Sequence, residues 1–160
     1  MRIRPIRAED DQQVYQLIRQ DLEEFGIAEP GTAYADPYLP HLTAYYASHQ
    51  PSAYWVLYEE AEPEKPLGSG GIAPIDFEHG ICELQKLYLL PEARGKGGSK
   101  LIMEAAITYA TQHYRQVYIE SRSELKTALK LYQRYGFREL SGPLSQSDHH
   151  FCDHWLIKDL

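Results

Sequence analysis

The sequence has few cysteines and no long apolar run. Its two cysteines, Cys82 and Cys152, are too few for a disulfide framework and are typical of a reducing compartment. The apolar stretches extend over only a few residues, far short of the ~20 that a membrane-spanning helix needs. The basic start, residues 1–4, is not followed by an apolar run with a small-residue cleavage site, so no signal peptide is expected. These absences predict a cytoplasmic protein that does not contact the membrane.

Basic residues are also scarce. The chain has 16 Lys and Arg against 23 Asp and Glu, a net charge of −7. Nucleic-acid binding needs a basic surface, so the sequence predicts no nucleic-acid partner. The segment 94–100 nevertheless contains three cations and no acid. This local positive charge on an acidic protein indicates one site for an anionic ligand.

The remaining composition is that of one globular domain. The 43% hydrophobic and 24% charged residues are ordinary for such a protein, and 160 residues can bury one sizeable core. There is no internal repeat, and the acidic, Pro-containing stretch 59–66 is too short to separate two domains. We expect a single domain over residues 1–160.

The spacing of apolar and turn residues predicts alternating strands and helices. Segment 30–40, rich in Pro, Gly, Tyr and Asp, is expected to be irregular. The expected strands are near 3–6 and at 53–58, 67–75, 83–90, 117–119, 137–140 and 151–157, and the expected helices are at 14–25, 42–49, 101–109 and 125–135. The order β-α-α-β-β-β-α-β-α-β-β predicts a mixed α/β sandwich with some parallel pairing.

The most informative segment is 88–100, where a strand ends, glycines turn the chain and an amphipathic helix begins. The free amides and the dipole of a helix N-terminus make an anion site, and glycines let neighbouring N–H groups converge. The glycine spacing fits neither a Walker loop nor a dinucleotide fingerprint. The alternative is a Gly-rich surface turn with solvated cations.

Two motifs resemble a known family. Arg94-x-x-Gly97-x-Ser99 is similar to the R/Q-x-x-G-x-G/A pyrophosphate loop of the GNAT acetyltransferase superfamily, and segment 128–137 resembles its A-x-x-L-Y-x-x-x-G-F helix and turn. The resemblance covers essentially the whole chain. It implies a mixed, largely antiparallel central sheet with helices on both faces. Two positions depart from the pattern: Ser99 replaces a usual Gly or Ala, and Leu125 replaces a frequent Asn, which weakens any carry-over of an Asn–cofactor contact.

The resemblance implies that the protein transfers an acetyl group from acetyl-CoA to a primary amine, directly through a ternary complex and without a metal. The backbone of Leu87, Tyr88 and Leu89 would pair with the pantetheine arm, and an N–H there would polarise the thioester carbonyl. The residues that would hold the pyrophosphate are Arg94, Gly95, Lys96, Gly97, Gly98, Ser99 and Lys100.

The family match also implies an acid for the chemistry. Tyr132, in the L-Y-x-x-x-G-F motif, is the candidate general acid toward the CoA thiolate, since a phenol of pKa ~10 is a plausible donor. The alternative is one more aromatic side chain on an apolar helix stripe.

Glu83 is the candidate general base, directly or through water, because it is an acid inside an apolar strand. Regular alternation would place it on one face with Gln85, Leu87 and Leu89. The alternatives are an edge carboxylate in solvent or a partner of Lys86. Glu120, at the end of the next strand, is the reserve base.

The acceptor side is less defined. Tyrosines in segment 34–46 can enclose an ammonium by cation–π contact, and the alternative is plain surface packing; they are Tyr34, Tyr38, Tyr45 and Tyr46. With Asp36 nearby they favour a small cationic amine or amino acid. His150, Cys152 and His154 would share a strand face, but without a paired ligand motif we expect no metal. We interpret His150 as part of the acceptor pocket wall, and the alternative is ordinary hairpin residues.

Three functions are compatible with these residues: acetylation of a small-molecule amine, acetylation of a protein lysine or N-terminus, and acyl-CoA sensing with weak catalysis. The combination of Glu83 and Tyr132 argues against a mere sensor, because binding needs neither. A homodimer is one possible state of assembly.

Overall fold

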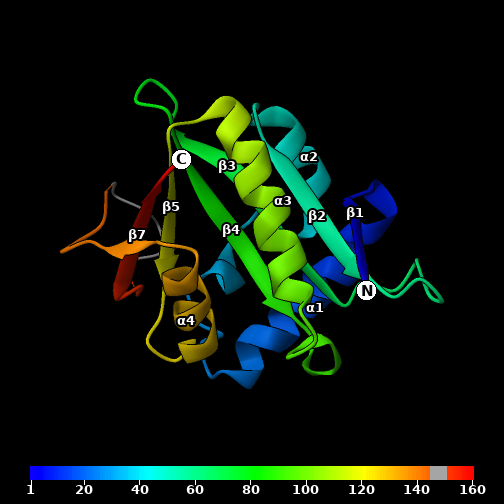
Figure 1. Cartoon of the computed structure of the whole chain (residues 1–160). Coiled ribbons are helices and arrows are strands. Elements are labelled where there is room, and N and C mark those ends of the chain that lie inside the picture. Colours follow the sequence, from blue (N-terminus) through cyan, green and yellow to red (C-terminus); the bar gives the residue numbers. More distant parts are fainter. Residues whose placement is uncertain (145–150) are drawn as a thin grey trace.

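The computed structural model describes residues 1–144 and 151–160 (Figure 1). The helices are α1 (Asp11–Glu24), α2 (Leu42–Ser48), α3 (Gly98–His113) and α4 (Lys126–Arg134). The strands are β1 (Arg2–Pro5), β2 (Ala53–Tyr58), β3 (Gly68–Asp76), β4 (Ile81–Leu89), β5 (Gln116–Ser121), β6 (Arg138–Glu139) and β7 (His154–Asp159). Segment 30–40 contains only short 3₁₀ turns, Ala33–Ala35 and the start of Leu39–His41. The predicted order of elements is confirmed.

The strands form one seven-stranded sheet in the order β1-β2-β3-β4-β5-β7-β6. Every neighbouring pair is antiparallel except β4 and β5, which run parallel because α3 crosses over between them. The expected mixed, largely antiparallel sheet is therefore confirmed.

Helices cover both faces of this sheet, as predicted. In Figure 1, α3 and α4 lie in front of the sheet, and α1 and α2 lie behind it. The apolar stripe of α1 packs with α2 and with Val56 of β2 in one buried cluster. On the opposite face, Met103 and Ala106 of α3 and Tyr132 of α4 pack on Val117 and Ile119 of β5.

Strand β4 contains a bulge at Lys86. Its register with β3 shifts by one residue between Gly71↔Gln85 and Ser69↔Tyr88, and Lys86 has a left-handed φ of 57°. A bulge of this kind interrupts the alternation of side chains.

The bulge corrects one expectation. Leu87 and Leu89 pack in the clusters on the α3 face, whereas Gln85 bonds to α2 through Tyr46 on the opposite face. Glu83, which bonds to Gln85, does not share a face with Leu87 and Leu89. The prediction from strict alternation was wrong because the extra residue reverses the phase of the strand.

The parallel pair β4–β5 separates early. It is paired from Ile81↔Gln116 only to Glu83↔Tyr118. Beyond that point β4 continues along β3 to Leu89, and β5 continues along β7 to Ser121. In the described part of the chain the two strands are thus unpaired past Glu83, and an opening separates them.

Candidate active site

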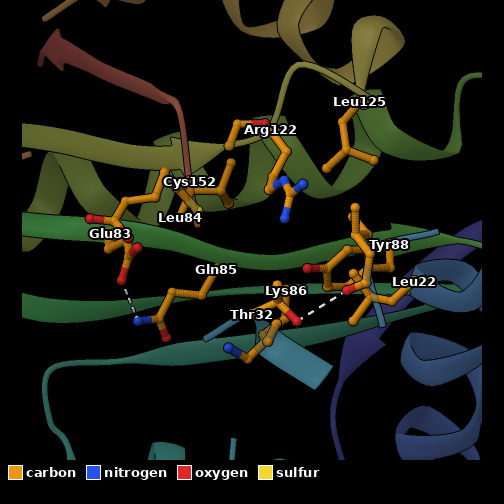
Figure 2. Close-up of a pocket in the computed structure, with 14 residues that line it drawn as sticks. Leu22, Thr32, Glu83, Leu84, Gln85, Lys86, Tyr88, Arg122, Leu125 and Cys152 are labelled. Carbon is orange, nitrogen blue, oxygen red and sulfur yellow. Dashed lines mark hydrogen bonds between the residues drawn. The ribbon is translucent and has the colours of Figure 1, made fainter. Parts of the chain in front are cut away.

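A pocket lies in the opening between β4 and β5 (Figure 2). Its walls come from α1 and the loop after it, from β4, from the end of β5 with the loop that follows, and from the segment before β7. The lining residues are Leu22, Ile27, Thr32, Ala33, Glu83, Leu84, Gln85, Lys86, Tyr88, Glu120, Ser121, Arg122, Leu125 and Cys152. The two predicted bases thus share one pocket.

Each of these carboxylates is oriented by a neighbour on its own strand. Gln85 Nε2 donates to Glu83 Oε2 at 2.6 Å, a contact drawn in Figure 2. The Tyr118 hydroxyl donates to Glu120 Oε1 at 2.9 Å. Glu83 and Tyr118 are register partners, so the two acids stand on adjacent strands at the point where the strands part. This geometry suits either acid as a proton acceptor.

Tyrosines from the expected irregular segment and from α2 lie near Glu83. The rings of Tyr38 and Tyr45 stack with centroids 3.9 Å apart, and the Tyr46 hydroxyl donates to Gln85 Oε1 at 2.9 Å. Burial raises the pKa of all three phenols, and the Glu83 carboxylate raises it further. The three side chains are therefore neutral hydrogen-bonding groups around an acid.

A buried ion pair joins this segment to the bulge. Lys86 Nζ binds the Asp36 carboxylate and lies 3.2 Å from the Tyr38 hydroxyl. The two charged side chains are only 2% and 8% exposed. The alternative, an ion pair of Lys86 with Glu83, is not observed, because the Lys86 ammonium binds Asp36 of the irregular segment 30–40 instead.

At the other end of the opening, the predicted loop leads into the N-terminus of α3. Gly97, with φ at 85°, occupies the N-cap position, and its carbonyl accepts from the N–H groups of Lys100 and Leu101 at 3.1 and 3.3 Å. The amides of Gly98 and Ser99 come too early in the helix to have an intrahelical acceptor. These donors and the helix dipole make the site suitable for an anion.

The two glycines serve different purposes. A Cβ on Gly98 would lie 2.5 Å from Leu57 Cδ2, so α3 packs closely on the sheet here and a larger residue would displace the leucine. A Cβ on Gly97 would have no heavy atom within 4 Å, so this position is open, and its positive φ is the requirement.

Arg94 fixes the loop to α1 and to β4. Its Nε donates to the Leu89 carbonyl at 2.9 Å, and its Nη atoms bind Asp21 at 2.7 Å and Glu24 at 2.6 Å. Burial raises the pKa of Asp21 to about 6, although the Arg94 hydrogen bond acts in the opposite direction. In this structure the guanidinium thus orients the loop, and its predicted contact with a phosphate stays a prediction.

Sequence and fold comparisons identify the family. Residues 12–137 match the sequence model of the acetyltransferase (GNAT) family. The chain belongs to the GNAT acetyltransferases. It is 36% identical to the uncharacterized N-acetyltransferase YjgM of Escherichia coli K12 over 162 residues, which covers 99% of this chain and 94% of that protein. The expected enzyme class, an N-acetyltransferase, is confirmed.

Solved structures share the fold of this GNAT protein. A GNAT acetyltransferase from Staphylococcus aureus Mu50 has a TM-score of 0.85 at 17% identity and covers 98% of this chain and 97% of its own. A phosphinothricin acetyltransferase from Sinorhizobium meliloti, solved in complex with acetyl-CoA, has a TM-score of 0.75 at 17% identity and covers 99% and 87%. Both likenesses concern the fold.

The predicted general acid of this GNAT enzyme, Tyr132, is not among the residues that line the pocket. Tyr132 is 5% exposed and packs with Phe137, with ring centroids 6.1 Å apart. Burial raises the pKa of its phenol. Burial is the main cause of the raised pKa of Tyr88, and Tyr132 adds to it. The role of Tyr132 stays a prediction.

The register of β4 with β3 shows which of the predicted backbone groups of β4 are open to a ligand. The Leu90 N–H donates to the Leu67 carbonyl at 2.9 Å. Because the direction of backbone groups alternates along an antiparallel strand, Tyr88 also faces β3, and Leu89 faces the open edge. The side chain of Tyr88 lines the pocket. The open backbone groups are those of Leu87 and the Leu89 N–H, because the Leu89 carbonyl accepts from Arg94.

Tyr34 is not brought to the pocket. Its hydroxyl donates to Glu23 at 2.6 Å and accepts a hydrogen bond from Arg19. The Arg19 guanidinium lies 3.7 Å from the centre of the Tyr34 ring. The side chain is thus held against α1, and its predicted contact with substrate stays a prediction.

Of the predicted group His150, Cys152 and His154, the structure describes only the last two. His150 lies outside the described residues, so its predicted place in the pocket wall stays a prediction. His154 Nδ1 lies 2.8 Å from Glu139 Oε1. Burial raises the pKa of Cys152 to about 12, which keeps the thiol protonated and makes it a poor nucleophile.

Within residues 1–144 and 151–160, no three His, Cys, Asp or Glu gather as metal ligands. No helix there combines the length and hydrophobicity needed to cross a bilayer.

Sequence reasoning missed four functional-site residues. Arg122 lines the pocket and binds Glu29 at 2.9 Å and Glu124 at 2.8 Å. The others are Asp21, Lys86 and Ser121. A polar residue within an apolar stripe or strand could have indicated such positions from the sequence. Asp21, for example, follows Leu17 by four residues on the buried face of α1.

Proposed function

We propose that the protein transfers the acetyl group of acetyl-CoA directly to the primary amine of a small cationic molecule. The observation that carries this proposal is the opening between β4 and β5. It has an anion-binding helix terminus at one end and a pocket with two carboxylates at the other. The Sinorhizobium meliloti enzyme of similar fold binds acetyl-CoA, which supports the choice of donor.

The donor end would bind the cofactor mainly through backbone groups. The Gly98 and Ser99 amides would receive the pyrophosphate, and the exposed Lys96 and Lys100 would add charge-assisted contacts. The Leu87 backbone and the Leu89 N–H would pair with the pantetheine amides along the unpaired edge of β4, as an added strand does.

The chemistry then needs a base, an oxyanion site and an acid. Glu83 or Glu120 would take a proton from the ammonium, directly or through one water. The amine nitrogen bonds to the acetyl carbon, and the carbonyl oxyanion is stabilised by a β4 N–H. As the C–S bond breaks, its electron pair stays on sulfur, and Tyr132 would supply the proton that the thiolate takes up. The second proton that the amine nitrogen loses would restore the Tyr132 hydroxyl.

The charges around the pocket favour a cationic acceptor. Two carboxylates, Glu83 and Glu120, line it. The two cations that also line it already bind acids: Lys86 binds Asp36 and Arg122 binds Glu29. The neighbouring Tyr38, Tyr45 and Tyr46 provide rings of the kind that attract an ammonium.

Calorimetry with CoA followed by an acceptor panel tests the proposal. CoA should bind in the presence of a chelator and more weakly as salt rises, because the phosphate contacts are ionic. Release of CoA thiol from acetyl-CoA should then be faster with alkyl amines and diamines than with lysine peptides or N-terminal peptides. Failure of the folded protein to bind CoA would contradict the proposal. Faster turnover of peptides than of small amines would show that the acceptor is a protein.

A further inference from the structure

Among the described residues, one buried hydroxyl of the pocket has no hydrogen-bond partner. Two buried side-chain polar atoms in the described part of the chain lack a hydrogen bond, Arg4 Nε and Ser121 Oγ. The Arg4 guanidinium still binds Asp10 through both of its Nη atoms, at 2.6 and 2.8 Å. Ser121 has a single polar side-chain group, is 4% exposed and lines the pocket. Leaving a buried hydroxyl unsatisfied costs free energy, so a ligand that completes its hydrogen bonding would explain its presence.

The face of β5 that carries Ser121 is well defined. The register of β5 with β7 is unbroken from Gln116↔Asp159 to Ser121↔His154. Side chains therefore alternate, and Ser121 lies on the face of Val117 and Ile119. Those two residues pack in the same cluster as Tyr132. Ser121 thus belongs to the Tyr132 side of the opening, opposite to the face that carries Glu120.

The position of Ser121 along the strand is equally informative. The last paired residues are Glu83 and Tyr118. Ser121 is three residues further along β5, and Lys86 is three residues further along β4. Ser121 therefore stands across the opening from the bulge, beside the open edge of Leu87. This is the level at which the thioester would lie if the pantetheine arm pairs with that edge.

We propose that the Ser121 hydroxyl donates a hydrogen bond to the sulfur of the acyl donor and of the CoA product. The inference rests on the proposed function. When the bond from the amine nitrogen to the acetyl carbon forms and the C–S bond breaks, the electron pair moves to sulfur. The Ser121 hydrogen bond stabilises that charge and keeps its proton, and Tyr132 supplies the proton that the sulfur gains.

Binding of CoA and of desulfo-CoA, in which hydrogen replaces the thiol, isolates the sulfur contact. Ser121→Ala should weaken CoA binding about tenfold at a pH where the bound thiol is ionised, as expected for one hydrogen bond to a charged group. Desulfo-CoA should bind the variant and the wild type equally. The melting temperature without ligand should stay the same or rise, because the substitution removes an unsatisfied polar group.

Ser69→Ala is the matched control. Ser69 is 0% exposed, and its hydroxyl accepts a hydrogen bond from Tyr54 at 2.9 Å. This substitution should lower the melting temperature and leave the ratio of CoA to desulfo-CoA affinity as in the wild type.

Two results would overturn the Ser121 proposal: equal weakening for both ligands, or no weakening for either, whatever the stability of the variant. A wild-type protein that binds neither ligand would instead contradict the proposed function. The two failures are therefore distinguishable.

Discussion

The two ends of the opening between β4 and β5 are built differently. The proposed donor end, residues 94–100, is one short segment whose groups suited to an anion are largely backbone amides at the start of α3. The proposed acceptor end is assembled from segment 30–40, α2, β4 and β5, and its polar groups belong to side chains. Backbone recognition needs only local chain geometry, whereas side-chain recognition depends on how distant elements pack.

Their lysines show the same contrast. Lys100, at the donor end, is an exposed cation 3.7 Å from Glu104 on its own helix. Lys86, at the acceptor end, is buried against an acid fifty positions earlier in the chain. The first is available to a ligand, and the second is part of the architecture that shapes the pocket.

Removing the buried lysine should have the largest effect. Lys86→Met leaves the Asp36 carboxylate buried without its ammonium partner, and we expect a loss of about 3–5 kcal/mol in the free energy of unfolding. Lys100→Met, the matched control, should change it by less than about 1 kcal/mol because exposed pairs contribute little. Urea unfolding measures both. Similar small losses in the two variants would remove the contrast between the two ends.

Replacing the carboxylates sharpens the assignment of the base. If Glu83 is the base, Glu83→Gln should lower kcat about 100-fold at neutral pH. The deficit should shrink as pH rises, since an alkyl ammonium with a pKa of ~10 then supplies more neutral amine. Glu120→Gln serves as the comparison, and pH profiles of kcat/KM decide between them. A deficit independent of pH in Glu83→Gln, with one that shrinks in Glu120→Gln, would make Glu120 the base.

Asp21 tests how the donor loop is held on α1. Its folded pKa of about 6 lies above the ordinary value of 3.8, so between these values the folded state binds more protons than the unfolded state. Stability from this group therefore rises as pH falls from 7 to 4, by about 2 kcal/mol. Asp21→Asn should lack this pH dependence. In urea unfolding, the stability of the wild type should therefore rise relative to that of the variant as pH falls over that range. A constant difference would show that Asp21 does not titrate there.

The glycines of the donor loop should give the smallest effect on stability. Gly95 and Gly97 both have positive φ, 72° and 85°, and both have open space where a Cβ would lie. Alanine at either position should cost roughly 1–2 kcal/mol of strain. Calorimetry with CoA should show several-fold weaker binding for Gly97→Ala, at the helix N-cap, than for Gly95→Ala. Equal affinities would place the pyrophosphate away from this helix terminus.

Much of the fold followed from local patterns in the sequence. The apolar stripe that begins at Val14 predicted α1, and the segment Ala53–Tyr58 coincides with β2. The bulge at Lys86 was not predictable in this way, because nothing in the sequence marks a lysine with positive φ inside an apolar strand. That one residue reversed the expected faces of Leu87 and Leu89.

The sequence by itself determined the family, the order of the elements and the Gly-rich donor loop, because these depend on residues close together along the chain. Only the tertiary structure decided which side chains meet in the pocket. Glu83 and Glu120 share it because β4 and β5 are parallel neighbours that part after three register pairs. Arg94 turns to α1 because Asp21 and Glu24 lie beside the loop. Such pairings join residues distant in sequence, and packing of the whole chain sets them.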